Sequence, residues 1–323
     1  MRHALTLARA QLGQTWPNPS VGAVVVKDNT IIGEGATAKG GRPHAETIAL
    51  AQAGNAAKGA TMYVTLEPCS HVGQTPPCAQ AIIDAGISHC IIATRDPNPK
   101  VDGGGIKMLK DAGIKITTGV CKKEASEQNR GFFSVIERGR PYIALKIAST
   151  ADEKIAAAEN TRTDITSAAA REHGQALRAE FDAILTGIGT VLADDPLLTV
   201  RTKGLEHKSP IRVVLDRQKR LPETSKVLPA WTYDLPLEEV IKDLTERGIT
   251  RLLIEAGQAL NTAFLDHDLV DSVYWYQSPD TLEDGLDAVK NSPLSERLSG
   301  WQPVGDMLTI GDDTLTILEK NRS

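Results

Sequence analysis

The chain has 323 residues, of which 41% are hydrophobic and 24% are charged, and its formal net charge is −5. This length allows two domains with full hydrophobic cores, and the negative charge gives no electrostatic reason to expect a nucleic-acid partner. No apolar run approaches the roughly 20 residues of a membrane span, and the N-terminus indicates an amphipathic helix and not a signal peptide. Four cysteines do not make a disulfide framework in such a chain. We therefore expect a cytoplasmic protein.

The first 140 residues alternate between predicted helices and strands. After the N-terminal helix comes a turn with two prolines, Pro17 and Pro19, and then a strand pair turned at Asp28-Asn29. Further strands are predicted at 61–66, 89–93 and 114–117, and further helices at 44–53, 77–85, 106–112 and 122–137. This order predicts an α/β sandwich built around a central sheet.

A zinc-binding pattern lies within this half. The imidazole of His44 and the thiols of Cys69 and Cys78 are ligands that suit Zn²⁺, and a site with three protein ligands leaves a fourth position for water. Glu46 is then the general base that takes a proton from this water and returns it to a leaving amine. His-x-Glu followed by Pro-Cys and a second Cys is the signature of zinc-dependent nucleobase deaminases.

The spacing of the two thiols is unusual for that signature. Two residues normally separate them, and here eight do, so the intervening loop must bulge out before a helix delivers Cys78. His44 and Cys78 both start predicted helices, whose N-termini favour thiolate and hydroxide. The alternative interpretation, a surface loop with unrelated cysteines and a core histidine, does not explain this ordered combination.

The second half contains another alternating pattern. Gly139 and Pro141 break the preceding helix, so we place a domain boundary there and divide the chain into residues 1–140 and 141–323. Strands are predicted at 142–148, 183–186, 211–215, 251–255 and 273–276, and helices at 167–180 and 237–247. The alternation predicts an α/β domain with a largely parallel sheet.

Some residues of this half could bind phosphate. Arg178 and Arg201 are fork-shaped donors suited to a substrate phosphate, and Gly257 opens a predicted helix whose free N–H groups could hold a cofactor phosphate. Considered alone, each arginine is more simply interpreted as a solvated charge.

Several segments carry a family resemblance. In the first half they are Pro17-Asn18-Pro19-Ser20-Val21-Gly22, His44-Ala45-Glu46, residues 65–78 and Asp96-Pro97-Asn98-Pro99; in the second they are Lys146, residues 190–201 and Glu255-Ala256-Gly257. Together they closely resemble the bifunctional deaminase–reductase family of riboflavin biosynthesis. The resemblance implies an N-terminal cytidine-deaminase-like three-layer sandwich and a C-terminal dihydrofolate-reductase-like α/β domain. It also implies Zn²⁺ and NADPH as cofactors, and a homodimer.

The resemblance further implies two reactions on one phosphorylated pyrimidine. The first hydrolyses the 2-amino group of 2,5-diamino-6-(5-phosphoribosylamino)pyrimidin-4-one, with zinc on His44, Cys69 and Cys78, Glu46 as proton shuttle and Asn18 in the base pocket. The second uses NADPH to reduce the ribosyl group to ribityl. The implied cofactor residues are Ala148, Asp164, Thr190, Asp194, Gly257, Gln258, Ala259, Leu260, Asn261, Thr262 and Ala263, and the implied substrate residues are Lys146, Arg162, Arg178, Leu198, Arg201 and Glu255.

The second half departs from the family pattern at several places. Thr150-Ala151-Asp152-Glu153 stands where the family has Ser-Leu-Asp-Gly. Arg162 replaces a Ser that would face the substrate, and Asp164 replaces a Trp that would face the cofactor. Arg217 replaces a Ser, and residues 277–280 replace an ending of apolar residues and glycine. A carboxylate beside a phosphate-rich cofactor is unfavourable unless it is paired. Either the cofactor pocket was rebuilt, with Arg162 taking a phosphate, or the domain became a scaffold; we favour an altered but working reductase.

Two other functions compete with this hypothesis. A deaminase of bases in nucleic acid should have a basic groove with aromatic side chains, whereas only 4% of this chain is aromatic. A zinc-stabilised binding module would keep its function when Glu46 is replaced by glutamine, whereas a deaminase would lose turnover.

Overall fold

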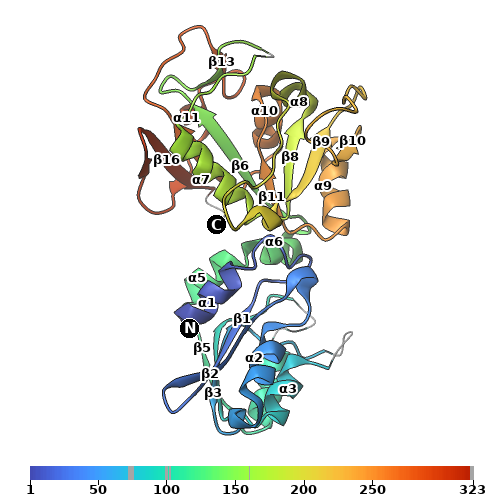
Figure 1. Ribbon diagram of the computed structural model, residues 1–323, viewed down its shortest axis with the longest axis vertical. Coiled ribbons are helices and arrows are strands. Elements are labelled where there is room, and N and C mark those ends of the chain that lie inside the picture. The colour runs from blue at the N-terminus through green and yellow to red at the C-terminus, as the bar shows by residue number, and fades with distance from the viewer. Residues whose placement is uncertain (72–75, 99–100, 102, 160, 321–323) are drawn as a thin grey trace. The chain divides into compact units, whose positions relative to one another are not determined.

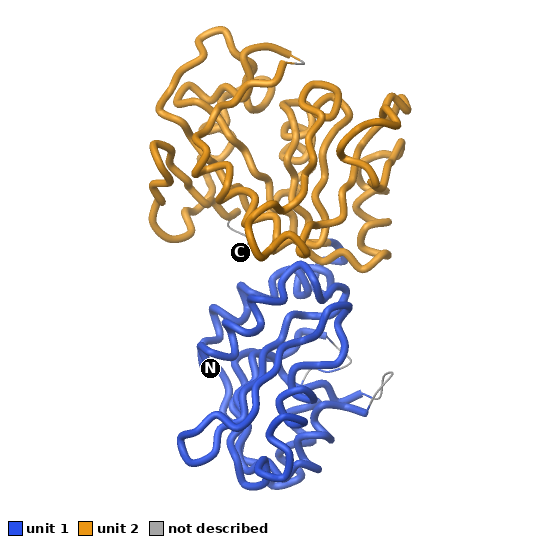
Figure 2. The backbone as a smooth tube through the Cα atoms, in the orientation of Figure 1, with its two compact units in different colours: residues 1–140 blue, residues 141–323 orange. Residues whose placement is uncertain are grey.

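The structure is a computed structural model that describes residues 1–71, 76–98, 101, 103–159 and 161–320. It divides into two compact units, residues 1–140 and 141–323 (Figure 2). Each unit has its own sheet and its own helices (Figure 1). Among the described residues, every helix is too short or too polar to span a lipid bilayer.

The first unit contains a five-stranded mixed sheet with the order β2-β1-β3-β4-β5. β1 pairs antiparallel with both β2 and β3, whereas β3, β4 and β5 run parallel. The strands are β1 (Gly22–Lys27), β2 (Thr30–Ala36), β3 (Thr61–Leu66), β4 (His89–Thr94) and β5 (Lys115–Thr118). The helices are α1 (Arg2–Arg9), α2 (Ala45–Ala53), α3 (Cys78–Asp84), α4 (Gly104–Asp111), α5 (Lys122–Gln128) and α6 (Arg130–Arg138), with 3₁₀ turns η1 (Lys39–Gly41) and η2 (Gly54–Ala57).

Helix α2 packs unusually close to β2. A Cβ atom at Gly33 would lie 2.2 Å from the carbonyl oxygen of Ala49, and one at Gly35 would lie 2.5 Å from that of Ala45. Glycine on the strand and alanine on the helix therefore allow the two backbones to approach. This approach fixes the N-terminal end of α2, where His44 and Glu46 lie.

The predicted α/β sandwich is confirmed, but one predicted helix is wrong. Residues 122–137 form two helices, α5 and α6, which are separated at Asn129. The Asn129 side chain is buried and donates to the carbonyl oxygen of Ala125 at 3.2 Å, which competes with the helical backbone.

The second unit contains a nine-stranded sheet. Its order is β10-β9-β8-β11-β6-β12-β16-β14, with β15 also paired to β16. The strands are β6 (Tyr142–Ser149), β8 (Ala183–Gly187), β9 (Ile211–Leu215), β10 (Trp231–Tyr233), β11 (Arg251–Ile254), β12 (Ser272–Gln277), β14 (Gln302–Pro303), β15 (Leu308–Ile310) and β16 (Asp313–Glu319), and a separate two-stranded sheet joins β7 (Lys154–Ala156) to β13 (Leu286–Asp287). The helices are α7 (Ala168–Arg178), α8 (Ile188–Asp194), α9 (Leu237–Glu246), α10 (Gln258–Asp266) and α11 (Leu294–Arg297), with one 3₁₀ turn, η3 (Glu206–Lys208).

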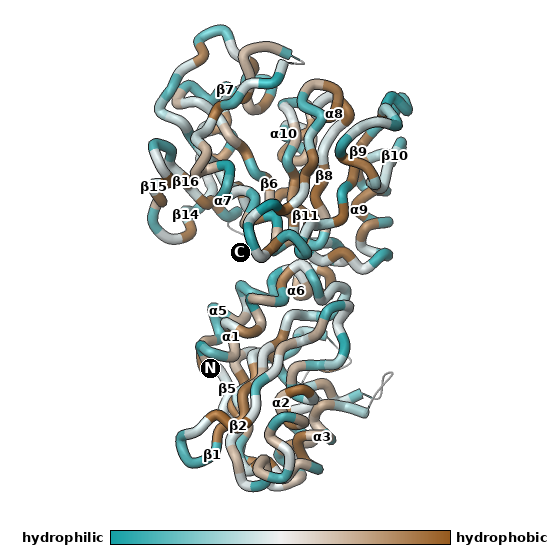
Figure 3. Tube along the Cα trace, in the orientation of Figure 1, coloured by the Kyte–Doolittle hydropathy of each residue, from teal (hydrophilic) through white to brown (hydrophobic). Residues whose placement is uncertain are grey.

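The parallel part of this sheet determines where the site forms. Strands β10, β9, β8, β11, β6 and β12 are mutually parallel, as predicted, and β16 then pairs antiparallel with β12. Central strands such as β8 and β11 are mostly apolar because both of their faces are buried (Figure 3). Their carboxyl ends lie at one edge of the sheet, where ligands bind in open α/β sheets.

Candidate active sites

The first candidate site is a cluster of three metal-ligating side chains. Nδ1 of His44 lies 3.2 Å from Sγ of Cys78 and 3.8 Å from Sγ of Cys69. A tetrahedral zinc ion about 2.1 Å from nitrogen and about 2.3 Å from sulfur would separate those atoms by about 3.6 Å. The two observed nitrogen–sulfur distances lie on either side of this expected distance, so the three side chains fit a zinc ion. Among the described residues, no other group of at least three His, Cys, Asp or Glu side chains converges in this way.

Two helix starts and one strand end bring these ligands together. His44 is the N-cap of α2, Cys69 follows β3, and Cys78 is the first residue of α3. The backbone N–H of Cys78 donates to Sγ of Cys69 at 3.3 Å, and that of Ala79 donates to the carbonyl oxygen of Cys69 at 3.1 Å. The ends of the long loop are therefore joined by hydrogen bonds beside the ligands, although residues 72–75 within it lie outside the described part of the chain.

The electrostatics of the cluster suit a cation. A hydrogen bond with Cys78 is the main cause that lowers the pKa of Cys69 to about 4, against its burial and with help from His44. The same hydrogen bond raises the pKa of Cys78. Glu46 is almost fully buried, and this burial raises its pKa to about 7. A carboxyl with a pKa near neutrality can both accept and donate a proton.

Asn18 lies against the segment that leads to His44. Gly41 has a φ of +85°, and a Cβ atom added to it would lie only 2.0 Å from Nδ2 of Asn18. Glycine is therefore required at this position for two reasons, the left-handed backbone and the Asn18 side chain. The contact holds the Asn18 amide next to a segment that ends three residues later at a zinc ligand.

Glu67 was assigned no role from the sequence, yet it supports the zinc loop. Its buried carboxylate accepts hydrogen bonds from the backbone N–H groups of Ile106 at 3.1 Å and Gly103 at 3.3 Å, which belong to the start of α4. A Cβ atom at Gly105 would lie 1.9 Å from the carbonyl oxygen of Pro68. The Glu-Pro-Cys order was the available signal, but the partner lies nearly 40 residues away.

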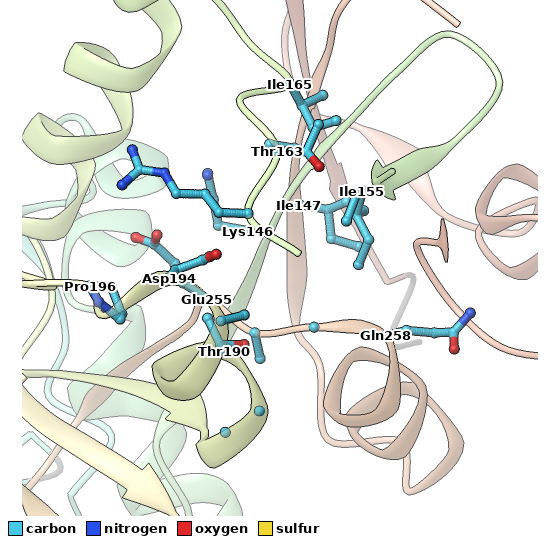
Figure 4. Close-up of a pocket in the computed structure, with 18 of the residues that line it drawn as sticks. Lys146, Ile147, Ile155, Thr163, Ile165, Thr190, Asp194, Pro196, Glu255 and Gln258 are labelled. Carbon is cyan, nitrogen blue, oxygen red and sulfur yellow. The ribbon is translucent and has the colours of Figure 1, made fainter. Parts of the chain in front are cut away.

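The second candidate site is a cavity of about 750 Å³ in the second unit. Every residue that the family resemblance implies for this unit lines it, except Thr262 and Ala263. Figure 4 shows Lys146, Asp194 and Thr190 on one side of the space and Ile155 and Thr163 on the other. The cavity has the size expected of a pocket for a dinucleotide or a drug-sized ligand.

A buried ion cluster forms one wall of the cavity. The guanidinium of Arg178 binds the carboxylate of Glu255 through two hydrogen bonds, of 2.7 and 2.8 Å, and also donates to the carbonyl oxygen of Thr199 at 3.0 Å. Burial alone would raise the pKa of Glu255. The charge and hydrogen bonds of Arg178, together with the charges of Lys146 and Arg201, outweigh burial and lower the pKa of Glu255 to about 2. Burial lowers the pKa of Lys146, against the attraction of Glu255.

The Lys146 side chain also contacts a tyrosine. Its ammonium lies 5.5 Å from the centroid of the Tyr276 ring, a cation–π distance, and the Tyr276 hydroxyl shares a 2.8 Å hydrogen bond with Nδ1 of His173. Tyr276 is almost fully buried. Sequence reasoning did not single out Tyr276 or His173, because neither lies in a recognisable motif.

Two of the departures from the family pattern pair with each other. Nη2 of Arg162 lies 3.4 Å from Oδ1 of Asp164, and both side chains are exposed at the cavity. Burial raises the pKa of the nearby Asp194; Arg162 opposes this effect and Asp164 adds to it. Arg162 therefore offsets the carboxylate that its neighbour introduces.

Two other departures also contact each other. The amide of Gln277 donates to the carbonyl oxygens of Thr150 at 3.4 Å and Ala151 at 3.3 Å, and the backbone N–H of Ala151 donates to the carbonyl oxygen of Asp280 at 2.8 Å. Glu153, which replaces a glycine, keeps a φ of +63° and accepts hydrogen bonds from the backbone N–H groups of Leu294 and Ser295. The two altered segments thus form one connected structure.

The side chains of Asn261 and Thr262 both make hydrogen bonds to the protein backbone. Nδ2 of Asn261 donates to the carbonyl oxygen of Ala288 at 3.0 Å, and the hydroxyl of Thr262 accepts from the backbone N–H of Lys290 at 2.9 Å. The Thr262 hydroxyl also donates to the carbonyl oxygen of Gln258 at 2.7 Å. Asn261 lines the cavity, whereas Thr262 does not.

Comparisons with known proteins agree with both sites. Residues 1–94 match the family model of the cytidine and deoxycytidylate deaminase zinc-binding region, and residues 141–284 match that of the RibD C-terminal domain. The riboflavin biosynthesis protein RibD of Aquifex aeolicus is 42% identical over 88% of either chain, and that of Haemophilus influenzae is 40% identical over 97% of this chain and 94% of the relative. This chain belongs to the RibD family.

Solved structures extend the assignment to the whole RibD chain. The RibD of Acinetobacter baumannii has a TM-score of 0.91 and 38% identity, covering 99% of this chain and 98% of that chain. A deaminase/reductase from Thermotoga maritima has a TM-score of 0.89 and 34% identity, covering 99% of this chain and 97% of that chain. The predicted family and the fold class of both units are confirmed. The chain is a bifunctional deaminase and reductase of riboflavin biosynthesis with a His/Cys/Cys zinc site.

Proposed function

We propose that residues 1–140 hydrolyse the 2-amino group of 2,5-diamino-6-(5-phosphoribosylamino)pyrimidin-4-one and that residues 141–323 reduce the ribosyl group of the product to ribityl with NADPH. The observation that carries the proposal is the presence of two chemically distinct sites in one RibD chain, a three-ligand zinc cluster beside a buried glutamate and a large cavity with a buried ion cluster. The similarity to the Thermotoga maritima protein, named as a diaminohydroxyphosphoribosylaminopyrimidine deaminase and 5-amino-6-(5-phosphoribosylamino)uracil reductase, supports the choice of substrates.

In the deaminase site, His44, Cys69 and Cys78 hold the metal and Glu46 moves the proton. Zinc, when bound, supplies a water molecule of lowered pKa. The Glu46 carboxylate accepts a proton and passes it to the departing amine, a role supported by its pKa of about 7. Asn18, held against Gly41, orients the pyrimidine through its amide, which can both donate and accept hydrogen bonds.

In the reductase site, the buried ion cluster binds the sugar portion of the substrate. Glu255 stays ionised and accepts hydrogen bonds from sugar hydroxyls, and the Lys146 ammonium donates to sugar oxygens. Arg178 holds Glu255 in place, and the exposed Arg201 binds the substrate phosphate. NADPH, when bound, supplies the hydride, and Gly257 to Leu260 with Thr190 and Asp194 form its part of the cavity.

The test follows ammonia release and NADPH oxidation together on the whole protein. We expect both signals from the diamino substrate in equal amounts. Glu46→Gln should abolish both with that substrate, by two or more orders of magnitude, but should keep zinc and still oxidise NADPH when the deaminated uracil compound is supplied. The control Glu34→Gln changes a carboxylate of β2 that contacts His3 and belongs to neither site, and should behave as the wild type.

Two results would overturn the proposal. Ammonia release that survives Glu46→Gln would remove Glu46 from the chemistry. Absence of NADPH oxidation by the wild type with the uracil compound would leave the second unit without its proposed reaction.

The family resemblance alone supports a homodimer that works in the cytoplasm. Light scattering should then give twice the 34.7 kDa mass of one chain, and cell fractionation should recover the protein with cytoplasmic enzymes. A monomeric mass, or recovery in another fraction, would contradict these two expectations.

A further inference from the structure

One wall of the reductase cavity comes from chain that follows the matched family region. That region ends at residue 284. β13 then pairs antiparallel with β7, and Leu286 lines the cavity together with Ile155 and Ala156. The chain next turns back toward α10 and brings Lys290 to the cavity.

The backbone around Lys290 is fixed by α10. The two hydrogen bonds described above join Asn261 to Ala288 and Thr262 to Lys290. A third joins the backbone N–H of Ala288 to the carbonyl oxygen of Glu153 at 3.0 Å. Ala288 and Val289 are almost fully buried, whereas Lys290 is exposed. The backbone that leads to Lys290 is therefore held in place, whereas the exposed Lys290 side chain can contact a ligand.

Among the described residues that line the cavity, three of the six other cations are paired with carboxylates. Arg178 binds Glu255, Arg162 pairs with Asp164, and Lys226 lies 3.1 Å from Asp195. No ion pair found within the described residues uses the ammonium of Lys290, although it lines the same cavity. An unbalanced cation at a site for a phosphate-bearing cofactor is available for an anion.

The N-terminus of α10 lies beside this lysine. The Thr262 hydroxyl accepts a hydrogen bond from the backbone N–H of Lys290 and donates one to the carbonyl oxygen of Gln258, in the first turn of the helix. Gly257, the N-cap, provides no side-chain cap, and residues 257–261 all line the cavity. In addition, Oδ1 of the buried Asn261 has no hydrogen-bond partner among the described residues.

We propose that Lys290 binds the pyrophosphate of the nicotinamide cofactor, together with the N-terminus of α10, and that Asn261 and Thr262 are positioning residues that hold Lys290 there. This inference rests on the proposed function of the second unit. The pyrophosphate is the fitting group because helix N-termini with a nearby lysine bind phosphate oxygens. The substrate phosphate is assigned to Arg201, on a different segment of the cavity wall.

The experiment is a fluorescence titration of the full chain with NADPH and with NADH, because both carry the pyrophosphate but only NADPH carries the 2′-phosphate. We expect Lys290→Gln to weaken the binding of both cofactors by the same factor, about tenfold for the loss of one charge-assisted contact. Lys290→Arg should stay close to the wild type. Thr262→Val should shift both affinities in the same direction as Lys290→Gln, by a smaller factor.

The control is Lys242→Gln, which removes the same charge from an exposed position of α9 outside the cavity and should change neither affinity. A loss restricted to NADPH would overturn the proposal and assign Lys290 to the 2′-phosphate. Unchanged binding of both cofactors in Lys290→Gln would overturn it as well. If the wild type bound neither cofactor, the reductase function would fail, and with it the role of Lys290.

Discussion

Replacing Glu255 by glutamine removes the carboxylate that balances two cations of the reductase cavity, Arg178 and Lys146. The carboxylate and guanidinium make two hydrogen bonds of 2.7 and 2.8 Å, and both side chains are largely buried, with 12% and 13% of their surface exposed. A buried cation that loses its partner cannot recover full solvation, so the variant should be less stable at neutral pH.

The magnitude follows from the pKa of Glu255. A pKa lowered from 4.5 to about 2 corresponds to about 3 kcal/mol at 1.36 kcal/mol per pH unit, within the range for breaking one side of a buried pair. Because the folded-state pKa is the lower one, this stabilisation is fully present above about pH 4.5 and is lost as the pH falls toward about 2. The difference between wild type and Glu255→Gln should therefore shrink by about 1 kcal/mol between pH 7 and pH 4.

The assay is urea unfolding of the whole chain at both pH values, followed by tryptophan fluorescence. Trp231, Trp275 and Trp301 lie in the second unit and Trp16 in the first. Glu246→Gln is the control, because the pair of Glu246 with Lys242 is 4.0 Å long and exposed, and such pairs contribute little. Equal stability of Glu255→Gln and wild type at pH 7, or a difference that does not change with pH, would refute the reasoning.

Four other results are expected. Removal of zinc by a chelator should stop ammonia release and leave NADPH oxidation with the uracil compound intact. Added zinc should restore ammonia release. Loss of both activities on zinc removal would contradict two separate sites. Gly41→Ala should displace Asn18 and lower kcat/KM of deamination by about tenfold to a hundredfold, with reduction as the internal control. Arg162→Ala should weaken NADPH binding because Asp164 is left unpaired, and the double variant with Asp164→Ala should recover it; equal binding in all three would count against the pairing. By urea unfolding, Glu153→Ala should cost more stability than Glu153→Gly. Both variants lose the hydrogen-bond acceptor, worth about 1 kcal/mol, but only alanine keeps the left-handed backbone strain of about 1 kcal/mol.

The zinc site could be predicted from the sequence because its chemistry is local. His44 and Glu46 lie on one helix turn, Cys69 follows a strand and Cys78 starts a helix, so residue type and periodicity suffice to identify them. The contribution of Glu67 could not be found in this way. Its partners at the start of α4 are far along the chain, and no local pattern connects them.

The cofactor segment 257–263 shows where sequence reasoning reaches its limit. The glycine and the helix that follows it were correctly expected, because a helix start has a local signature. The hydrogen bonds of the Asn261 and Thr262 side chains could not be predicted, because they depend on residues 288–290 returning to the helix. Only the packed chain decides which polar groups are used by protein and which remain for a ligand.

The sequence by itself determined the two-part organisation, the alternation of strands and helices, the zinc ligands with their glutamate, and the family. These features depend on residue types at short spacing, where hydrophobic periodicity and ligand chemistry act directly. The tertiary structure alone decided that the departures pair with one another, that β16 extends the sheet beside β12, and that Lys290 reaches the cavity beside α10. Each of these contacts joins side chains or strands through the fold, and its free energy depends on distances and burial that exist only after the chain has folded.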